Sequence, residues 1–250
     1  MYEMDVLGYR AKVGLLLPYT NTVVQPECDS MRPMGVTNHT SRVENIYRPV
    51  NDLLAYEKTI GQGEDLVQQS LDRLMPCKPN IVLLGHSLDA FFGGVEEEAL
   101  SAERLSKYAG VEVVLPPTAL VAALKVLIKG RRISLLTPYM PPGDKAVKHY
   151  FEEAGFEVTH LHGMRAQSPT AIAEISPSQL REALHLIDGP DVDAIVQCGT
   201  NTATATFAAQ ASVILGKPFI ACNVACYWFA LRKLGIKDQM SGFGDLLEKH

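Results

Sequence analysis

The two halves of the sequence repeat each other, and this repeat limits the folds open to the chain. Three segments of the first half recur in the same order in the second half, at steadily shrinking separation. The matched pairs are residues 13–19 with 133–139, 81–87 with 194–200, and 122–127 with 229–234. We therefore predict a duplicated unit, with one copy in residues 1–130 and the other in residues 131–250. The C-terminal helix is a candidate to cross back onto the first copy.

Short β-branched and apolar runs alternate with longer segments of helical periodicity, which predicts an α/β fold. The expected strands are residues 13–17, 81–84, 111–115, 133–137, 156–161, 194–197 and 218–221, with a further one at 36–47. The expected helices are residues 52–75, 96–109, 118–128, 144–154, 176–187, 202–215 and 225–234. Continuous apolar runs are typical of parallel strands covered on both faces. We predict two Rossmann-like (flavodoxin-like) units with parallel sheets and pseudo-two-fold symmetry, and an active site in the cleft between them.

Local signals support two of these helix boundaries. Ser176 followed by Pro177 is typical of an N-cap with proline in the first helical turn, and Gly155 is placed as a C-cap.

Composition excludes several classes of partner. The formal net charge is −5, and the sequence has no basic run of the kind that binds nucleic acid. No apolar stretch approaches the roughly 18 residues of a membrane span, and residues 1–10 do not resemble a signal peptide. The five cysteines form no metal-type pairs and are odd in number, which favours a reducing cytoplasm.

The segment Gln197-Cys198-Gly199-Thr200-Asn201-Thr202 carries the strongest signal for chemistry. It follows a buried strand and precedes a predicted helix, so backbone N–H groups there can receive an anion. A cysteine in such a field is expected to have a lowered pKa. The alternative is that Cys198 is a small buried apolar residue at a strand end.

The equivalent turn of the first half holds Gly85, His86, Ser87 and Leu88. Ser87 and nearby backbone N–H groups could form a second anion site. His86 is either a hydrogen-bonded surface histidine or a general base.

Three further segments are expected at the same edge of the sheets. Asn21 and Thr22 follow the first strand, and each is either a helix cap or a ligand. Tyr139 is a candidate phenolic donor to an oxyanion. Asn223 follows the last strand and is again either cap or ligand. Met164 and residues 43–47 are candidates for the wall around the substrate's side chain.

Several motifs are absent from the sequence. There is no GxGxxG after the first strand, no P-loop and no GxSxG. The pair His160 and His162 lacks an obvious third ligand, so no metal site is predicted.

Taken together, these turns, Tyr139 and the closing segment from Asn223 to Gly235 resemble the Asp/Glu racemase superfamily. Within it the chain looks most similar to arylmalonate decarboxylases and maleate cis-trans isomerases. The resemblance implies an enzyme without metal or organic cofactor. It also implies an oxyanion pocket at Ser87, Tyr139, Cys198, Gly199 and Thr200. The resemblance allows a homo-oligomer.

Racemases of this superfamily carry one cysteine in each half, and decarboxylases keep only the second. This chain has Gly85 in the first position and Cys198 in the second. The pattern therefore favours a cofactor-independent decarboxylase, a carbon–carbon lyase of a 2-substituted malonate-like diacid, with Cys198 as the proton donor. Leu88 would be a wall of the apolar pocket for the departing carboxylate.

Two alternatives remain open at this point. One is a maleate cis-trans isomerase or an Asp/Glu-type racemase, with His86 or the thiol of Cys198 replacing the missing partner. The other is a non-catalytic protein that binds carboxylates. In every case the expected ligand is a small mono- or dicarboxylic acid.

Overall fold

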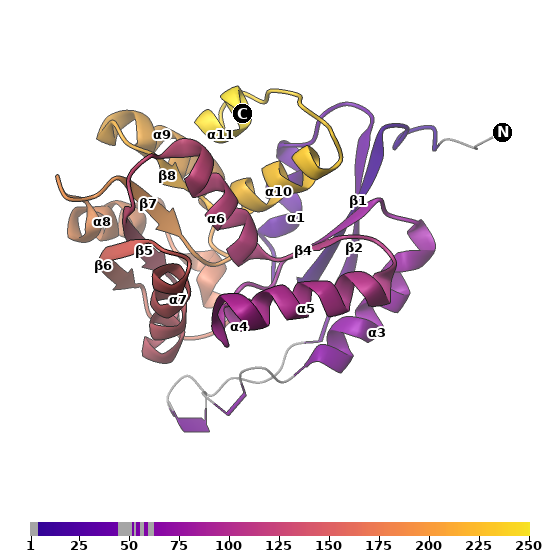
Figure 1. Ribbon diagram of the computed structural model, residues 1–250, viewed down its shortest axis with the longest axis horizontal. Coiled ribbons are helices and arrows are strands. Elements are labelled where there is room, and N and C mark those ends of the chain that lie inside the picture. Colours follow the sequence, from indigo (N-terminus) through magenta and orange to yellow (C-terminus); the bar gives the residue numbers. More distant parts are fainter. Residues whose placement is uncertain (1–4, 45–51, 53, 56–57, 60–62) are drawn as a thin grey trace.

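The computed structural model describes residues 5–44, 52, 54–55, 58–59 and 63–250 (Figure 1). Two four-stranded sheets, each entirely parallel, form its centre. In chain order the strands are β1 (Ala11–Pro18), β2 (Val36–Val43), β3 (Ile81–Leu84), β4 (Val113–Val114), β5 (Arg132–Thr137), β6 (Glu157–Gly163), β7 (Ala194–Gln197) and β8 (Phe219–Ile220). The sheet orders are β2-β1-β3-β4 and β6-β5-β7-β8. The same order in both sheets confirms the duplicated α/β fold predicted from the repeat.

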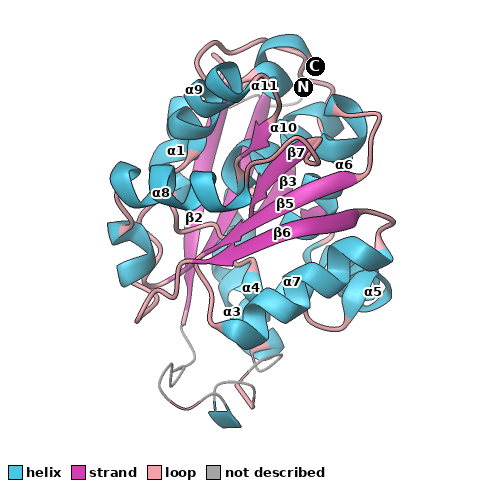
Figure 2. Ribbon diagram, turned by 90° about the vertical axis from the view of Figure 1, so that its left-hand side faces the viewer, coloured by secondary structure: helices cyan, strands magenta, loops and turns pink. Residues whose placement is uncertain are grey.

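Helices lie on both sides of the sheets (Figure 2). They are α1 (Val24–Ser30), α3 (Glu64–Leu74), α4 (Leu88–Phe91), α5 (Gly94–Ala109), α6 (Pro116–Leu127), α7 (Pro141–Glu153), α8 (Pro177–Ile187), α9 (Ala205–Leu215), α10 (Cys222–Lys233) and α11 (Asp245–Lys249). Burial within the strands explains this layering. Neighbours along a strand point to opposite faces, yet Leu15 and Leu16 are both 0% exposed. Both faces of β1 are therefore covered, as the continuous apolar runs predicted.

Within each sheet, the register of the strands places the candidate loops next to each other at the same edge. Leu16 of β1 pairs with Leu84 of β3, and Leu136 of β5 pairs with Gln197 of β7. Because the strands are parallel, the loops that follow β1 and β3 leave the first sheet together. The loops that follow β5 and β7 leave the second sheet in the same way.

The C-terminal part of the chain packs on the first half. Helix α10 contacts α1, α6 and β3, and α6 in turn contacts β8. These two helices are the third matched pair of the sequence repeat. The division of the chain near residue 130 stays a prediction.

The sequence predicted the position of each strand that the described residues form, but it misplaced some helices. Helix α9 begins at Ala205 and not at residue 202, because residues 198–204 form the turn of the candidate site. The short helices α1, α4 and α11 were missed because elements of four to seven residues have too few turns to show a periodicity. Helix α3 starts at Glu64. Most of residues 52–62, the first part of a predicted helix, lie outside the described residues. Residues 45–47, the end of the strand predicted over 36–47, also lie outside them.

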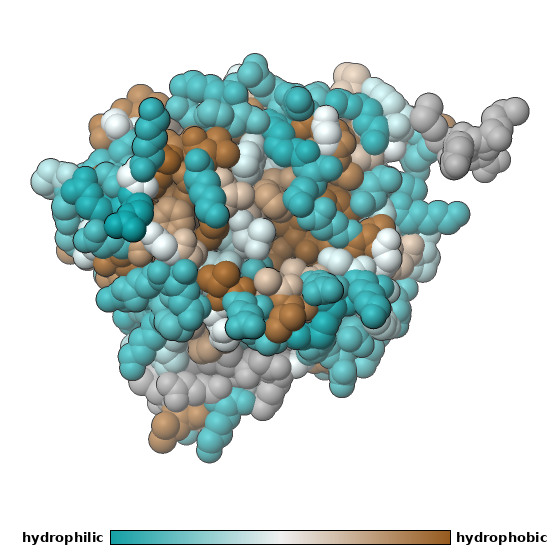
Figure 3. Space-filling model, in the orientation of Figure 1, coloured by the Kyte–Doolittle hydropathy of each residue, from teal (hydrophilic) through white to brown (hydrophobic). Residues whose placement is uncertain are grey.

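On the face shown in Figure 3, hydrophilic side chains interleave with smaller apolar areas. Within the described ranges, no helix is long and apolar enough to cross a membrane.

The predicted start of α8 is confirmed in detail. The Ser176 hydroxyl accepts a hydrogen bond from the Gln179 N–H at 3.3 Å, and the Gln179 side chain accepts one from the Ser176 N–H at 2.9 Å. This reciprocal pair is a capping box. We expect Ser176→Ala to lower the free energy of unfolding by about 1 kcal/mol in urea titration. Ser178→Ala is the control, because Ser178 lies two residues further along and takes no part in the capping box. An equal loss in both variants would contradict this role.

Candidate active site

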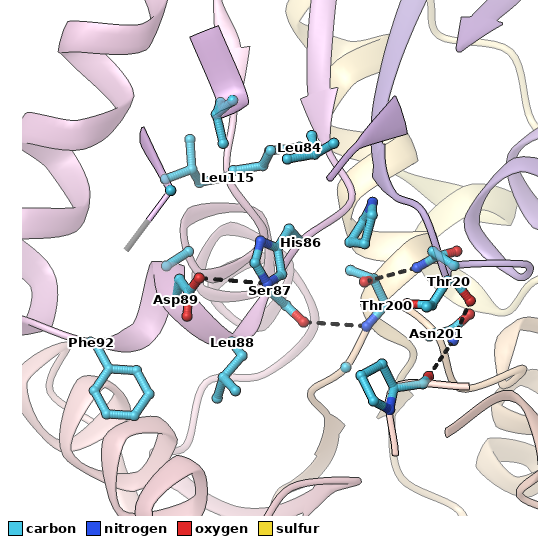
Figure 4. A pocket seen from close by; sticks show the side chains of 18 of the residues that line it. Thr20, Leu84, His86, Ser87, Leu88, Asp89, Phe92, Leu115, Thr200 and Asn201 are labelled. Carbon is cyan, nitrogen blue, oxygen red and sulfur yellow. Dashed lines mark hydrogen bonds and ion pairs between the residues drawn. The ribbon is translucent and has the colours of Figure 1, made fainter. Parts of the chain in front are cut away.

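A cavity of about 300 Å³ lies where the loops after β1, β3, β5 and β7 meet (Figure 4). The first half contributes the loops after β1 and β3, and the second half contributes those after β5 and β7. Predicted site residues that line it are Asn21, His86, Ser87, Leu88, Tyr139, Gly199, Thr200 and Asn201. Val43, from the suspected 43–47 stretch, also lines it. The structure therefore brings these predicted residues together at one cavity, and their role in binding or catalysis stays a prediction.

Other predicted residues lie elsewhere. Thr22 is exposed, whereas Gly85, Cys198 and Asn223 are buried, and none of these four is among the described residues of the cavity wall. Met164 is also absent from that wall, where Ala166 lies instead.

A group of hydrogen-bond donors spans the two halves of the chain at the cavity wall. The hydroxyls of Ser87 and Tyr139 are 2.6 Å apart and share a hydrogen bond. The Thr200 N–H donates to Ser87 Oγ at 3.3 Å, and the Thr200 hydroxyl donates to the Gly85 carbonyl at 2.7 Å. Two hydroxyls and one amide thus converge on one region of the wall. This is the arrangement that stabilises negative charge on a carboxylate or an enediolate.

Tyr139 is held by groups that the sequence did not single out. Thr137 Oγ1 accepts a hydrogen bond from the Tyr139 N–H at 3.2 Å and donates to Asp144 at 2.5 Å. Arg165 donates to the Tyr139 carbonyl at 2.6 Å and also pairs with Asp144. Asp144 is 5% exposed, so its carboxylate fixes this turn from inside the protein. An acidic residue in the first turn of α7 was the one available sequence signal.

Asn21 acts both as a cap and as a bridge. Its side-chain oxygen accepts the N–H groups of Val23 and Val24 at 3.1 and 3.0 Å, and its amide donates to the Thr200 hydroxyl at 3.3 Å. Asn201 accepts a hydrogen bond from the Thr22 N–H at 2.9 Å. Both asparagines therefore connect the β1 loop to the β7 loop. For Asn21 the sequence offered only a helix cap or a ligand, and it did not suggest a contact between the two loops.

The start of α9 is already occupied by a carboxylate of the protein. Glu27 of α1 accepts the N–H groups of Thr204 and Ala205 at 3.0 and 2.9 Å, and the Asn223 amide at 2.7 Å. Asn223 also donates to the Thr200 carbonyl at 2.9 Å. The expected anion site at this helix terminus is thus filled from within. The sequence analysis did not identify Glu27, because its partners Thr204 and Ala205 are far away in the sequence and only the folded chain brings them together.

The expectation of a lowered pKa at Cys198 is wrong. Burial raises the pKa of the Cys198 thiol well above its usual value, and the nearby Cys222 thiol and Asp144 carboxylate raise it further. The side chain is 0% exposed, and its N–H donates to the Leu136 carbonyl at 2.8 Å as a continuation of the sheet. The helix that was to favour the thiolate starts only at Ala205. No comparison tests a catalytic role of Cys198, which stays a prediction.

Gly199, and not Cys198, faces the cavity in this turn. Its φ angle of +142° is one that residues with a side chain rarely adopt. A Cβ atom there would lie 2.7 Å from the ring of Pro138. The Gln197 amide holds the turn by donating to the Gly199 carbonyl at 2.7 Å, while its oxygen accepts from Thr204 and from the Cys222 N–H. Gln197 is the polar residue at the end of a buried strand, and this was the signal in the sequence that could have identified it.

The rest of the wall carries charge of both signs. His86 Nε2 lies 3.6 Å from Asp89 Oδ2, three residues further along. Arg104 lines the cavity but pairs with Glu97 at 2.9 Å and with Glu64 at 3.4 Å. Among the described residues there is no group of three or more His, Cys, Asp or Glu side chains that could hold a metal ion.

Comparison with known proteins places this geometry in a family. A match to the family described as arylmalonate decarboxylase spans residues 13–247. The chain belongs to the arylmalonate decarboxylase family. A structure of an arylmalonate decarboxylase variant in its liganded form has a TM-score of 0.76 and 18% identity, and the match covers 96% of this chain and 100% of that one. At this identity the likeness shows the fold.

Maleate isomerases also match over nearly the whole chain. The enzyme of Pseudomonas putida is 27% identical over 94% of this chain and 96% of its own length. A mutant maleate cis-trans isomerase of Nocardia farcinica, with a covalently bound succinylcysteine intermediate, has a TM-score of 0.83 and 22% identity. That match covers 96% of this chain and 99% of the other. These matches confirm the resemblance to both groups that the sequence indicated.

The main functional prediction from the sequence, a decarboxylase acting as a carbon–carbon lyase, is wrong. Four curated relatives of this family member carry the name maleate isomerase. The isomerase alternative fits these findings better. The prediction failed because it took one retained cysteine as the mark of a decarboxylase, whereas the curated relatives are named maleate isomerase.

The burial of Cys198 leads to a simple labelling prediction. Cys77 is exposed, whereas Cys28, Cys198, Cys222 and Cys226 are buried. Iodoacetamide at neutral pH should therefore modify Cys77 alone in the native protein and all five cysteines after denaturation. Peptide mass spectrometry reads out the positions. Rapid modification of Cys198 in the native protein would show that its thiol is accessible.

Glu27 should make the stability of the protein depend on pH. Burial raises the pKa of its carboxyl, against the lowering effect of its hydrogen bonds. The folded state therefore holds this proton more tightly than the unfolded state. The contribution to stability is complete below the unfolded pKa of roughly 4.3 and is lost as pH rises through the folded pKa.

Glu27→Gln should remove this dependence of the free energy of unfolding on pH. The stability of the variant relative to the natural protein should therefore rise with pH above roughly 4.3. Urea unfolding across a pH series measures the difference. The exposed Glu96→Gln is the control, and parallel curves for Glu27→Gln and the natural protein would contradict the assignment.

Proposed function

We propose that this protein is an isomerase of a small unsaturated carboxylic acid, of the maleate cis-trans type. The observation that carries the proposal is the set of donors from Ser87, Tyr139 and Thr200, which joins both halves at the cavity. The names of the curated relatives support the choice of reaction. The reference substrate is maleate. All five cysteines are free, which is in keeping with a reducing cytoplasm as the location.

The reaction begins with the addition of a nucleophile to one alkene carbon. The π electron pair then moves onto the neighbouring carboxylate, which becomes an enediolate. Rotation about the new single bond followed by loss of the nucleophile gives the trans acid. The Nocardia farcinica relative holds a succinylcysteine, which is the product of such an addition once the second alkene carbon has taken up a proton.

The donors of the cavity fit the charge that this sequence develops. In the structure one of the Ser87 and Tyr139 hydroxyls donates to the other, and the Thr200 N–H donates to Ser87 Oγ. A bound enediolate would replace these contacts and accept from the same donors. One such donor contributes on the order of 3–4 kcal/mol to transition-state stabilisation. Among the described residues of the wall, Arg104 already pairs with two carboxylates, and we expect a substrate carboxylate to meet the neutral donors Ser87, Tyr139 and Thr200.

Racemisation fits the site less well. It requires acid–base groups on opposite faces of one carbon atom. Gly85 occupies the first-half position where superfamily racemases carry a cysteine, and a Cβ atom there would lie 2.5 Å from Leu17. Addition and elimination at one face need only one reacting group.

Conversion of maleate to fumarate, followed by proton NMR, tests the proposal. Tyr139→Phe and Ser87→Ala should each lower kcat/KM by about 10²–10³-fold, because each removes one donor to the enediolate. Tyr108→Phe, which removes an exposed hydroxyl bonded to Asp72, is the matched control. Maleate left unchanged by the natural protein, or full activity in both site variants, would contradict the proposal.

A further inference from the structure

The cavity has an apolar part in addition to its group of hydrogen-bond donors. Its volume of about 300 Å³ lies at the lower end of the range in which proteins enclose drug-sized ligands. The donors of Ser87, Tyr139 and Thr200 meet at one region of the wall. Maleate held there by a carboxylate leaves the apolar part empty, so the cavity has room for a further group of the substrate.

The apolar part lies in the first half, where the cavity opens onto a hydrophobic cluster between the sheet and helices α3 and α5. Leu84 of β3, Leu105 of α5 and Leu115 after β4 belong to this cluster and line the cavity. They are only 6%, 3% and 2% exposed. Leu66 and Val67 of α3 are half-buried and line the same part. We call these five residues the apolar arm.

The apolar arm and the donors lie on different sides of the turn after β3. In Figure 4, Leu115 lies on one side of Ser87, and Thr200 and Asn201 lie on the other. All four residues line the same cavity. A substrate whose carboxylate binds near Thr200 can therefore extend past Ser87 toward the arm.

The charged groups around the cavity are mostly acidic. In the described part of its wall, the guanidinium of Arg104 is accompanied by five carboxyl groups, those of Glu44, Glu64, Asp89, Glu97 and Glu98. Arg104 pairs with Glu97 at 2.9 Å and with Glu64 at 3.4 Å, which joins α5 to α3 beside the arm. An anionic group in the arm would meet this negative charge in an apolar surrounding, which is costly. An uncharged apolar group would gain free energy from burial there.

We propose that the substrate of this enzyme is a cis-butenedioate with an uncharged apolar substituent on C2, and that the apolar arm binds this substituent. The inference rests on the proposed isomerase function. The carboxylate on C2 meets the donors, the nucleophile adds to C3, and the enediolate forms over C1 and C2. Rotation about the C2–C3 bond then moves only the other half of the molecule. The substituent stays in the arm throughout, so it binds equally in substrate and transition state and lowers mainly KM.

A panel of four acids tests this substrate class, with conversion followed by proton NMR. The panel consists of maleate, 2-methylmaleate, 2-isobutylmaleate and cis-aconitate. In cis-aconitate a carboxymethyl group replaces the isobutyl group, so these two acids differ in charge at similar shape. Each buried carbon should raise kcat/KM by about fourfold. We therefore expect 2-isobutylmaleate to exceed maleate by at least about tenfold, mainly through KM, and cis-aconitate to fall below maleate.

Val67→Phe should fill the arm from α3 and so reverse this preference. The ratio of kcat/KM for 2-isobutylmaleate to that for maleate should fall by at least about tenfold, since the substituent loses its place. Both acids are measured with the same preparation, so a loss of folded protein does not affect the ratio. Val126→Phe, the same exchange at a 41% exposed position of α6, is the matched control and should leave the ratio unchanged.

The outcomes separate this inference from the isomerase function. Conversion of maleate with no gain for 2-isobutylmaleate, equal conversion of 2-isobutylmaleate and cis-aconitate, or an unchanged ratio in Val67→Phe would overturn the inference and leave the isomerase function in place. If none of the four acids is converted, the isomerase function is rejected. The saturated acids 2-isobutylsuccinate and succinate then decide the inference in saturation-transfer NMR. Tighter binding of 2-isobutylsuccinate would support the arm, and equal binding would reject it.

Discussion

Thr200 joins the loops of the two halves at the candidate site, and the geometry of that site depends on it. Its hydroxyl donates to the Gly85 carbonyl and accepts from Asn21, its N–H donates to Ser87, and its carbonyl accepts from Asn223. It is 5% exposed, so water competes little for these bonds. One residue of the β7 loop thereby sets the position of the loops after β1 and β3.

The same junction explains why, in the part of the wall that the structure describes, the β7 turn contributes Gly199 and Thr200 but not Cys198. To direct its N–H and hydroxyl toward the first half, Thr200 follows a glycine in a conformation with positive φ. That turn places Gly199 at the wall and leaves Cys198 in the sheet, where its N–H pairs with Leu136. The Glu27 carboxylate of α1 accepts the hydrogen bonds of the amides at the start of α9. The amide that lies beside Ser87 and Tyr139 is therefore that of Thr200.

Sequence reasoning reached most of the fold and many residues of the site. Strands such as β1 and β5 were visible because their unbroken apolar runs are buried on both faces. The turn residues Ser87 and Tyr139 followed from the repeat, since parallel strands of matched units end at the same edge. Glu27, Gln197 and Asp144 were missed because their partners are distant in sequence or placed by a turn. The decarboxylase prediction failed for a different reason, because the presence of one cysteine, Cys198, does not by itself decide which reaction a chain of this superfamily performs.

The sequence by itself determined that this chain is a duplicated α/β protein, because hydrophobic periodicity and internal repetition are local properties. It also predicted a candidate site at the strand ends. Only the tertiary structure decided which side chains of each turn reach the cavity. Whether Cys198 or Gly199 faces the substrate depends on one backbone conformation, which is fixed by Pro138, Gln197 and the contacts of Thr200. These groups come from both halves of the chain, and their meeting is a consequence of packing that no single segment encodes.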